Sequence, residues 1–130
     1  MATTISNNLS GDGMNSSEAQ KALDASQELQ ITVTGRRTKK EYSTPVWFVR
    51  EAKTIFLLPG GGSRSSWYKN AMHSERIKIS SGKVSIDLTP KPIADSAKLA
   101  SVVDKFRRKY GPAYYSDPKR FDVALDLTLP

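Results

Sequence analysis

Short apolar runs that alternate with polar residues constrain this chain of 130 residues more than any other feature. In the clearest run, 121–129, Phe, Val and Leu occupy every second position. A period of two residues is typical of strands that bury one face. Such runs predict six strands, at 29–34, 44–50, 54–59, 75–80, 83–89 and 121–129. Because their connections are short, we expect antiparallel pairing, and six short strands with few helices predict a small β-barrel.

Two other stretches have helical spacing. Between 93 and 110, apolar residues recur every three or four positions, and a Gly-Pro pair ends the pattern. A shorter pattern begins at Ser16 or Ser17 and has a thin apolar face. The fold class is therefore mainly β with α (α+β), with one long helix before the last strand and a short N-terminal helix. We expect a single domain at 16–130, after a polar, disordered tail at 1–15.

Composition excludes several classes of function. The chain has no cysteine, which rules out disulfides, thiolate zinc sites and cysteine nucleophiles. Its single histidine, His73, argues against Ser-His-Asp hydrolysis and a histidine metal site, so no metal is expected. No apolar run approaches the about 20 residues of a membrane helix. The N-terminus also lacks the pattern of a secretory signal, so a cytoplasmic protein is the simplest expectation.

Two polar connections between predicted strands carry much of the formal charge of +7. The first, 35–40, reads GRRTKK, and the second, 60–66, reads GGGSRSS and leads into a short predicted helix at 67–72, capped by a serine. Arginines bind phosphate through paired hydrogen bonds, and backbone N–H groups at a helix start attract anions. We therefore expect a phosphorylated ligand between these loops. Solvated turns would carry the same residues, and this alternative stays open.

Nucleic acid is another ligand that suits a basic face. We rank it last, because the aromatic residues do not form a repeated stacking face along the predicted strands. Trp67 and Tyr68 fit a core or a dimer interface as well as a cofactor ring.

The order of these motifs resembles the small split β-barrel flavin and deazaflavin oxidoreductases. These are relatives of pyridoxamine-phosphate oxidase, and the resemblance is strongest to their deazaflavin-dependent nitroreductase branch. A strand ending in G-R-R-T is followed by a T-P strand, a charged hairpin, a Gly-Gly loop and W-Y-x-N. The matching positions are Gly35, Arg36, Arg37, Thr38, Thr44, Pro45, Gly60, Gly61, Trp67, Tyr68 and Asn70. The chain departs from the branch at Lys39, where glycine is usual, at Tyr42, where arginine is frequent, and at Pro59, where lysine is frequent.

The resemblance implies a six-stranded antiparallel split β-barrel that forms a homodimer, with part of the Trp47–Trp67 aromatic set in the interface. Its activity would be hydride or electron transfer from a reduced 8-hydroxy-5-deazaflavin coenzyme, or from FMN, to a quinone, nitro compound or activated alkene. Tyr110 and Tyr114 would lie on the substrate side of the cofactor and help to deliver a proton. The cofactor would be held by Arg36, Arg37, Thr38, Thr44, Pro45, Gly60, Gly61, Arg64, Trp67 and Asn70. The alternative is a non-catalytic split barrel that retains flavin, haem or another ligand for storage or sensing.

Overall fold

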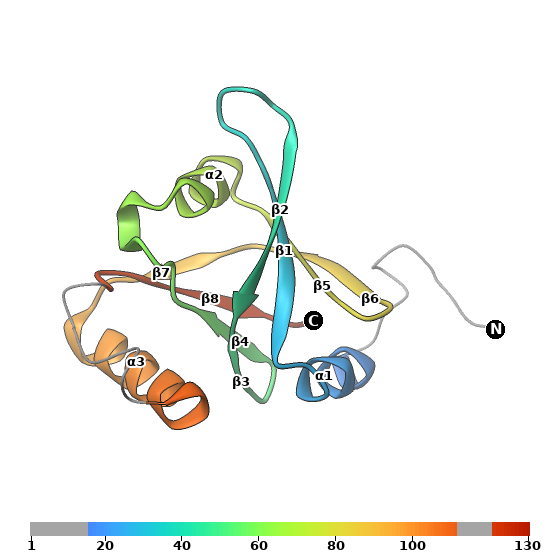
Figure 1. Cartoon of the computed structure of the whole chain (residues 1–130), viewed down its shortest axis with the longest axis vertical. Coiled ribbons are helices and arrows are strands. Elements are labelled where there is room, and N and C mark those ends of the chain that lie inside the picture. The colour runs from blue at the N-terminus through green and yellow to red at the C-terminus, as the bar shows by residue number, and fades with distance from the viewer. Residues whose placement is uncertain (1–15, 112–120) are drawn as a thin grey trace.

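A computed structural model shows two antiparallel sheets with helices on their outer sides (Figure 1). The structure describes residues 16–111 and 121–130. Within these ranges it has eight strands, three α-helices and one short 3₁₀ helix. The α+β class, the long helix before the last strand and the short N-terminal helix are confirmed. The predicted tail at 1–15 and Tyr114 lie outside the described residues.

Each sheet has four strands, and every strand pair in both sheets is antiparallel. The first sheet has the order β2-β1-β5-β6, with β1 at Glu28–Thr34, β2 at Glu41–Trp47, β5 at Ile77–Ser81 and β6 at Val84–Leu88. The second has the order β3-β4-β8-β7, with β3 at Val49–Glu51, β4 at Thr54–Leu57, β7 at Lys91–Ile93 and β8 at Ala124–Thr128.

The count of eight strands differs from the six that the sequence predicted. The predicted strand 44–50 is two strands, β2 and β3, which belong to different sheets. Phe48 lies between them and is 1% exposed, so the chain leaves one sheet and enters the other while this ring is buried in the core. The strand β7 was missed because Pro92 interrupts the apolar pattern. Its position at the edge of the second sheet tolerates a proline, which has no N–H to donate.

The core between the two sheets is built from the alternating residues of both. Ile31 and Ile79 come from the first sheet, Ile55 and Leu125 from the second, and each is at most 1% exposed. Burying one such aliphatic side chain is worth about 1.5–3 kcal/mol, so these positions hold the two sheets together.

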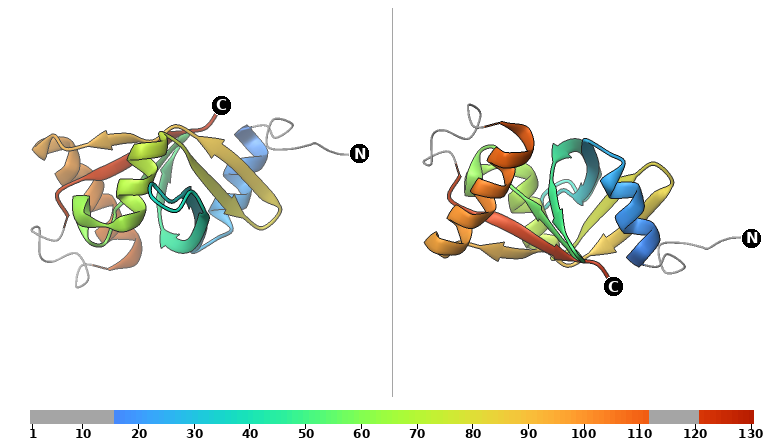
Figure 2. Two further views of the ribbon diagram at one scale, coloured as in Figure 1. Left: turned by 90° about the horizontal axis from the view of Figure 1, so that it is seen from above. Right: turned by 90° about the horizontal axis from the view of Figure 1, so that it is seen from below.

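The helices cover opposite sides of the sheets (Figure 2). The long helix α3, Ser96–Tyr110, packs Val102, Val103 and Phe106 against the second sheet. Asp95 caps it, because its side chain accepts a hydrogen bond from the Lys98 N–H.

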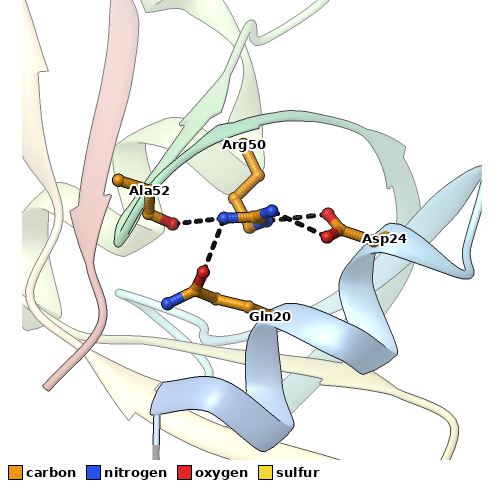
Figure 3. A network of polar contacts seen from close by, with 4 residues as sticks. All are labelled: Gln20, Asp24, Arg50 and Ala52. Carbon is orange, nitrogen blue, oxygen red and sulfur yellow. Dashed lines mark hydrogen bonds and ion pairs between the residues drawn. The ribbon is translucent and has the colours of Figure 1, made fainter.

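The N-terminal helix α1, Ser16–Asp24, buries its thin apolar face in the main core. Arg50 in β3 fixes it, as Figure 3 shows. The guanidinium donates to both carboxylate oxygens of Asp24, at 2.8 and 2.7 Å, and to the Gln20 side chain at 2.9 Å. The hydrogen bond from Arg50 lowers the pKa of Asp24 below its usual value. The helix therefore belongs to the packed domain.

Candidate functional site

A cavity of about 530 Å³ lies between the β1–β2 hairpin and the start of helix α2, Ser66–Ser74. The hairpin extends beyond the body of the sheets beside α2 (Figure 1). The predicted cofactor residues that line this first cavity are Arg36, Arg37, Thr38, Thr44, Trp67 and Asn70, joined by Val33, Gly35, Tyr42, Ser43, Ser65 and Ser66. The structure therefore brings the G-R-R-T loop and the W-Y-x-N segment to the same cavity.

Asn70 connects these two segments. Its side chain is buried, and its Oδ1 accepts hydrogen bonds from the Arg36 backbone N–H at 3.0 Å and from the Arg36 guanidinium at 2.8 Å. An amide oxygen orients the guanidinium without cancelling its charge. None of the ion pairs between described residues involves Arg36 or Arg37. The first cavity therefore keeps two positive charges.

The shape of the basic loop explains two departures from the resembling branch. Lys39 has φ 64°, a left-handed conformation that glycine adopts without strain, which accounts for glycine being usual at this position. Tyr42 donates or accepts a hydrogen bond with the Thr38 hydroxyl at 2.7 Å, so it braces the loop from the next strand. A Cβ on Gly35 would lie 2.5 Å from the Thr38 oxygen, and this close approach requires glycine. The loop is thus a fixed structure that presents Arg36.

The glycine-rich loop has a different arrangement. It forms a 3₁₀ helix, η2, at Gly62–Arg64, followed by Ser65, which caps α2 by accepting a hydrogen bond from the Tyr68 N–H. The predicted helix after this loop is confirmed. Ser63 donates from its N–H at 2.7 Å and from its hydroxyl at 2.6 Å to the carboxylate of Asp122. These hydrogen bonds lower the pKa of Asp122 below its usual value.

Asp122 was missed as a site residue because in the sequence it is one polar position in the alternating run 121–129. Because the N–H and the hydroxyl of Ser63 both donate to the carboxylate of Asp122, these two donors are already occupied by a group of the same protein. Gly61 and Arg64 line neither the first cavity nor the second, which follows. The sequence predicted that both loops grip a phosphate. Among the described residues, Asp122 occupies hydrogen-bond donors of the glycine-rich loop, whereas no carboxylate accepts a hydrogen bond from the basic loop.

A second cavity of about 290 Å³ continues along β2 from the first. Thr44 lines the first cavity and Pro45 the second, while Trp67 lines both. The predicted cofactor residues Pro45, Gly60 and Trp67 lie here, together with Glu28, Val46, Trp47, Leu58 and Phe106. The predicted site residues thus divide between two neighbouring cavities, one basic and one largely aromatic.

Tyr110, predicted to deliver a proton, is the last residue of α3 and lines neither cavity. Its ring stacks on Trp47 with centroids 4.2 Å apart and planes within 3°. Its hydroxyl accepts from the Phe48 N–H at 3.1 Å and lies at 2.7 Å from the Gln27 carbonyl oxygen and 2.9 Å from that of Phe48. Burial raises the pKa of this phenol. The hydroxyl therefore joins the residue before β1, the bend at Phe48 and α3.

Solved structures share this fold at low sequence identity. An F420-H2-dependent reductase (FDR-A) superposes with a TM-score of 0.63 and 19% identity, over 78% of this chain and 93% of that one. HutZ, the heme storage protein from Vibrio cholerae, superposes with a TM-score of 0.68 and 14% identity, over 90% of this chain and 92% of that one. A putative pyridoxamine 5′-phosphate oxidase from Listeria innocua superposes with a TM-score of 0.68 and 10% identity, over 88% of this chain and 92% of that one. These likenesses show the fold of the protein, which is the split β-barrel seen in pyridoxamine-phosphate-oxidase-like proteins.

Within this class, residues 20–127 match the family described as "Uncharacterized protein conserved in bacteria (DUF2255)", and the chain belongs to that family. No curated protein matches the sequence significantly. None of the helices in the described ranges is long and apolar enough to cross a membrane.

Proposed function

We propose that the protein binds a phosphate-bearing redox cofactor and catalyses hydride or electron transfer from it to a small organic acceptor. The first candidate for this cofactor is an 8-hydroxy-5-deazaflavin coenzyme, and the second is FMN. The observation that carries the proposal is the contact between Asn70 and Arg36. A buried neutral amide fixes a guanidinium at the wall of a cavity, and none of the described residues that line this cavity is a carboxylate. This arrangement suits an anionic group on a ligand.

The residues present fit such a cofactor. Arg36, Arg37 and the Thr38 hydroxyl would bind its phosphate, and the start of α2 adds backbone donors at Ser66 and Trp67 to the same cavity. The flat ring would extend along β2 past Thr44 as far as Trp67, which lines both cavities, and the second cavity, with Pro45 and Gly60, would take the acceptor. The cofactor supplies the redox chemistry, and the protein positions it and shapes the acceptor pocket.

The second candidate is a non-catalytic barrel that stores or senses a flavin or haem. Tyr110 favours it, because its hydroxyl is engaged with backbone atoms of Phe48 and Gln27. One of the solved structures with this fold is a heme storage protein. A homodimer is part of either proposal. β2 is an edge strand that exposes Tyr42 by 46% and Trp47 by 37%, and a second copy would cover these rings.

The test is a titration of wild type, Arg36→Ala and Arg37→Ala with reduced deazaflavin and FMN, followed by absorbance. Losing a charge-assisted hydrogen bond costs about 1.5–3 kcal/mol, so each variant should bind about ten- to a hundredfold more weakly. Arg64→Ala removes the same charge from the glycine-rich loop and is the matched control; it should bind within about twofold of wild type. The free energy of unfolding should barely change in Arg37→Ala and Arg64→Ala, since both side chains are exposed.

A mixed oligonucleotide at two salt concentrations completes the experiment. Nucleic-acid binding would show a salt slope of about 0.7–0.9 per phosphate contacted, and each lost arginine would flatten it by about one. Tight, salt-dependent oligonucleotide binding without affinity for either cofactor would overturn the proposal.

Tyr110→Phe tests whether this tyrosine acts in turnover or in packing. The contacts of its hydroxyl predict a loss of about 1–2 kcal/mol in the free energy of unfolding, measured with urea, because backbone groups of Phe48 and Gln27 lose a partner. A proton donor would instead lower turnover about a hundredfold at unchanged cofactor affinity. Unchanged stability combined with such a loss of turnover would restore the catalytic role predicted from the sequence.

A further inference from the structure

The second cavity has a chemistry of its own. Three aromatic side chains, Trp47, Trp67 and Phe106, form its walls with the apolar Leu58. Glu28 is the only charged residue among the described residues that line it. An aromatic pocket with one carboxylate is unexpected in a chain whose formal net charge is +7. The two neighbouring cavities therefore carry opposite charge.

The carboxylate and one indole ring are positioned as a pair by the sheet. Glu28 and Trp47 lie directly opposite each other in the antiparallel pairing of β1 with β2. Side chains of such a pair leave the same face of the sheet, with Cβ atoms about 4.5–5.5 Å apart. The parallel stack of Trp47 on Tyr110 then fixes the indole ring, and the hydrogen bonds of the Tyr110 hydroxyl fix Tyr110. The Trp47 ring of this pair is therefore held in place, and Glu28 is exposed at the opposite position of β1.

This carboxylate takes part in none of the ion pairs between described residues. Those pairs are Arg50–Asp24, Lys105–Glu51 and Arg108–Asp104. A positive group placed beside an aromatic face and a carboxylate is attracted by both the ring quadrupole and the charge. A neutral ligand would gain only the apolar contacts, and an anion would be repelled.

We propose that the second cavity is a binding site for a small aromatic or conjugated organic cation, with its ring against Trp67 and Trp47 and its positive group beside Glu28. Binding of this cation does not depend on the proposed function. Its role as the electron acceptor, which takes the hydride given up by the reduced cofactor, rests on the proposed function. Trp67, which lines both cavities, then lies between cofactor and acceptor.

Three nitroarenes of similar size and different charge test the proposal by calorimetric titration of the intact chain. They are (4-nitrobenzyl)trimethylammonium, 4-nitrobenzyl alcohol and 4-nitrophenylacetate. The cation should bind most tightly and the anion least. Glu28→Gln should weaken the cation about three- to tenfold and leave the neutral compound within about twofold. Glu41→Gln, at the opposite end of the same strand pair and outside the second cavity, removes the same charge and should change none of the three.

Trp47→Leu separates the aromatic contribution from the charge. It should weaken the cation and the neutral compound together, because both lose ring contact, and Glu28→Gln should change only the cation. Equal affinities for the three compounds, or loss of cation binding in Glu41→Gln as large as in Glu28→Gln, would overturn the inference. If FMN and deazaflavin fail to bind while the charge order holds, the proposed function fails and the cation site stands. If a cofactor binds and the charge order is absent, the reverse is true.

Discussion

The basic loop at 35–40 and the glycine-rich loop at 60–66 look alike in the sequence, since both combine glycine, hydroxyl side chains and arginine. In the structure each is held by one side chain from elsewhere in the chain. Asn70 accepts two hydrogen bonds from Arg36, and Asp122 accepts two from Ser63. The accepting side chain is a neutral amide in the basic loop and a carboxylate in the glycine-rich loop.

This difference decides what each loop can bind. The amide oxygen of Asn70 orients the Arg36 guanidinium and leaves its charge available to a ligand, whereas the carboxylate of Asp122 occupies the Ser63 donors and adds a negative charge beside the glycine-rich loop. The lowered pKa of Asp122, caused mainly by the hydrogen bonds from Ser63, means that it stays ionised at neutral pH. An anion would have to displace it. Whether such a loop can bind phosphate therefore depends on the side chain that contacts it from elsewhere in the fold as much as on the residues of the loop.

Replacing Asn70, the hydrogen-bond acceptor of the basic loop, should have the largest effect, which is on cofactor affinity. Asn70→Asp would place a carboxylate on the Arg36 guanidinium, form an ion pair and repel a phosphate. Loss of the charge-assisted contact together with this repulsion predicts cofactor binding weaker by about a hundredfold or more. The measurement is the titration of deazaflavin and FMN used for the arginine variants.

His73→Asp is the control for this exchange, since it adds a negative charge to the same helix at an exposed position. It should change cofactor affinity by about twofold or less. If Asn70→Asp binds cofactor as wild type does, the charge of Arg36 is not what the cavity offers, and the contrast between the loops loses its meaning for function.

Replacing Asp122, the hydrogen-bond acceptor of the glycine-rich loop, should have a smaller effect, which is on the free energy of unfolding. The pKa of Asp122 is lowered in the folded protein, so the ionised carboxylate stabilises the fold at pH 7, and this contribution is lost as the pH falls below about 4. Asp122→Asn should therefore lower the free energy of unfolding by about 0.5–1 kcal/mol at pH 7, a modest value because the carboxylate is exposed.

Urea unfolding of wild type and Asp122→Asn at pH 7 and near pH 2.5 checks both the size and the sign, with Asp126→Asn as the matched control on the same segment. The difference between wild type and variant should shrink toward zero at the lower pH. A difference that persists unchanged in acid would show that the carboxylate charge does not hold the loop.

Local patterns along the chain account for much of the fold. The alternation at 121–129 corresponds to β8, and the helical spacing between 93 and 110 corresponds to α3. A serine cap and the helix after it could be predicted from the sequence, because capping involves residues three positions apart. The grouping of Arg36 with Asn70 came from the resemblance, since 34 residues separate them.

Other features have no local signal. A continuous apolar run such as 44–50 is typical of one strand, and only the packing of Phe48 between two sheets divides it. Glu28 and Trp47 become neighbours through the register of β1 with β2, which the residues of neither strand specify alone. For the same reason the resemblance could imply that Tyr110 lies on the substrate side of a cofactor, although the partners of its hydroxyl are backbone atoms of Gln27 and Phe48.

Which residues are apolar, and at what period, can be read along the chain, and this accounts for most of the strands and the helices; the surplus of cations on two loops can be read in the same way. These properties depend on neighbours within a few positions, where backbone geometry fixes which side chains share a face. Only tertiary contacts distinguish the two loops, because Asp122 reaches Ser63 across 59 positions and occupies its donors, while Asn70 orients Arg36 and leaves its charge in place. The tertiary structure also decided that an acid and two tryptophans share a cavity, because only the pairing of distant strands and helices brings such groups within interaction distance.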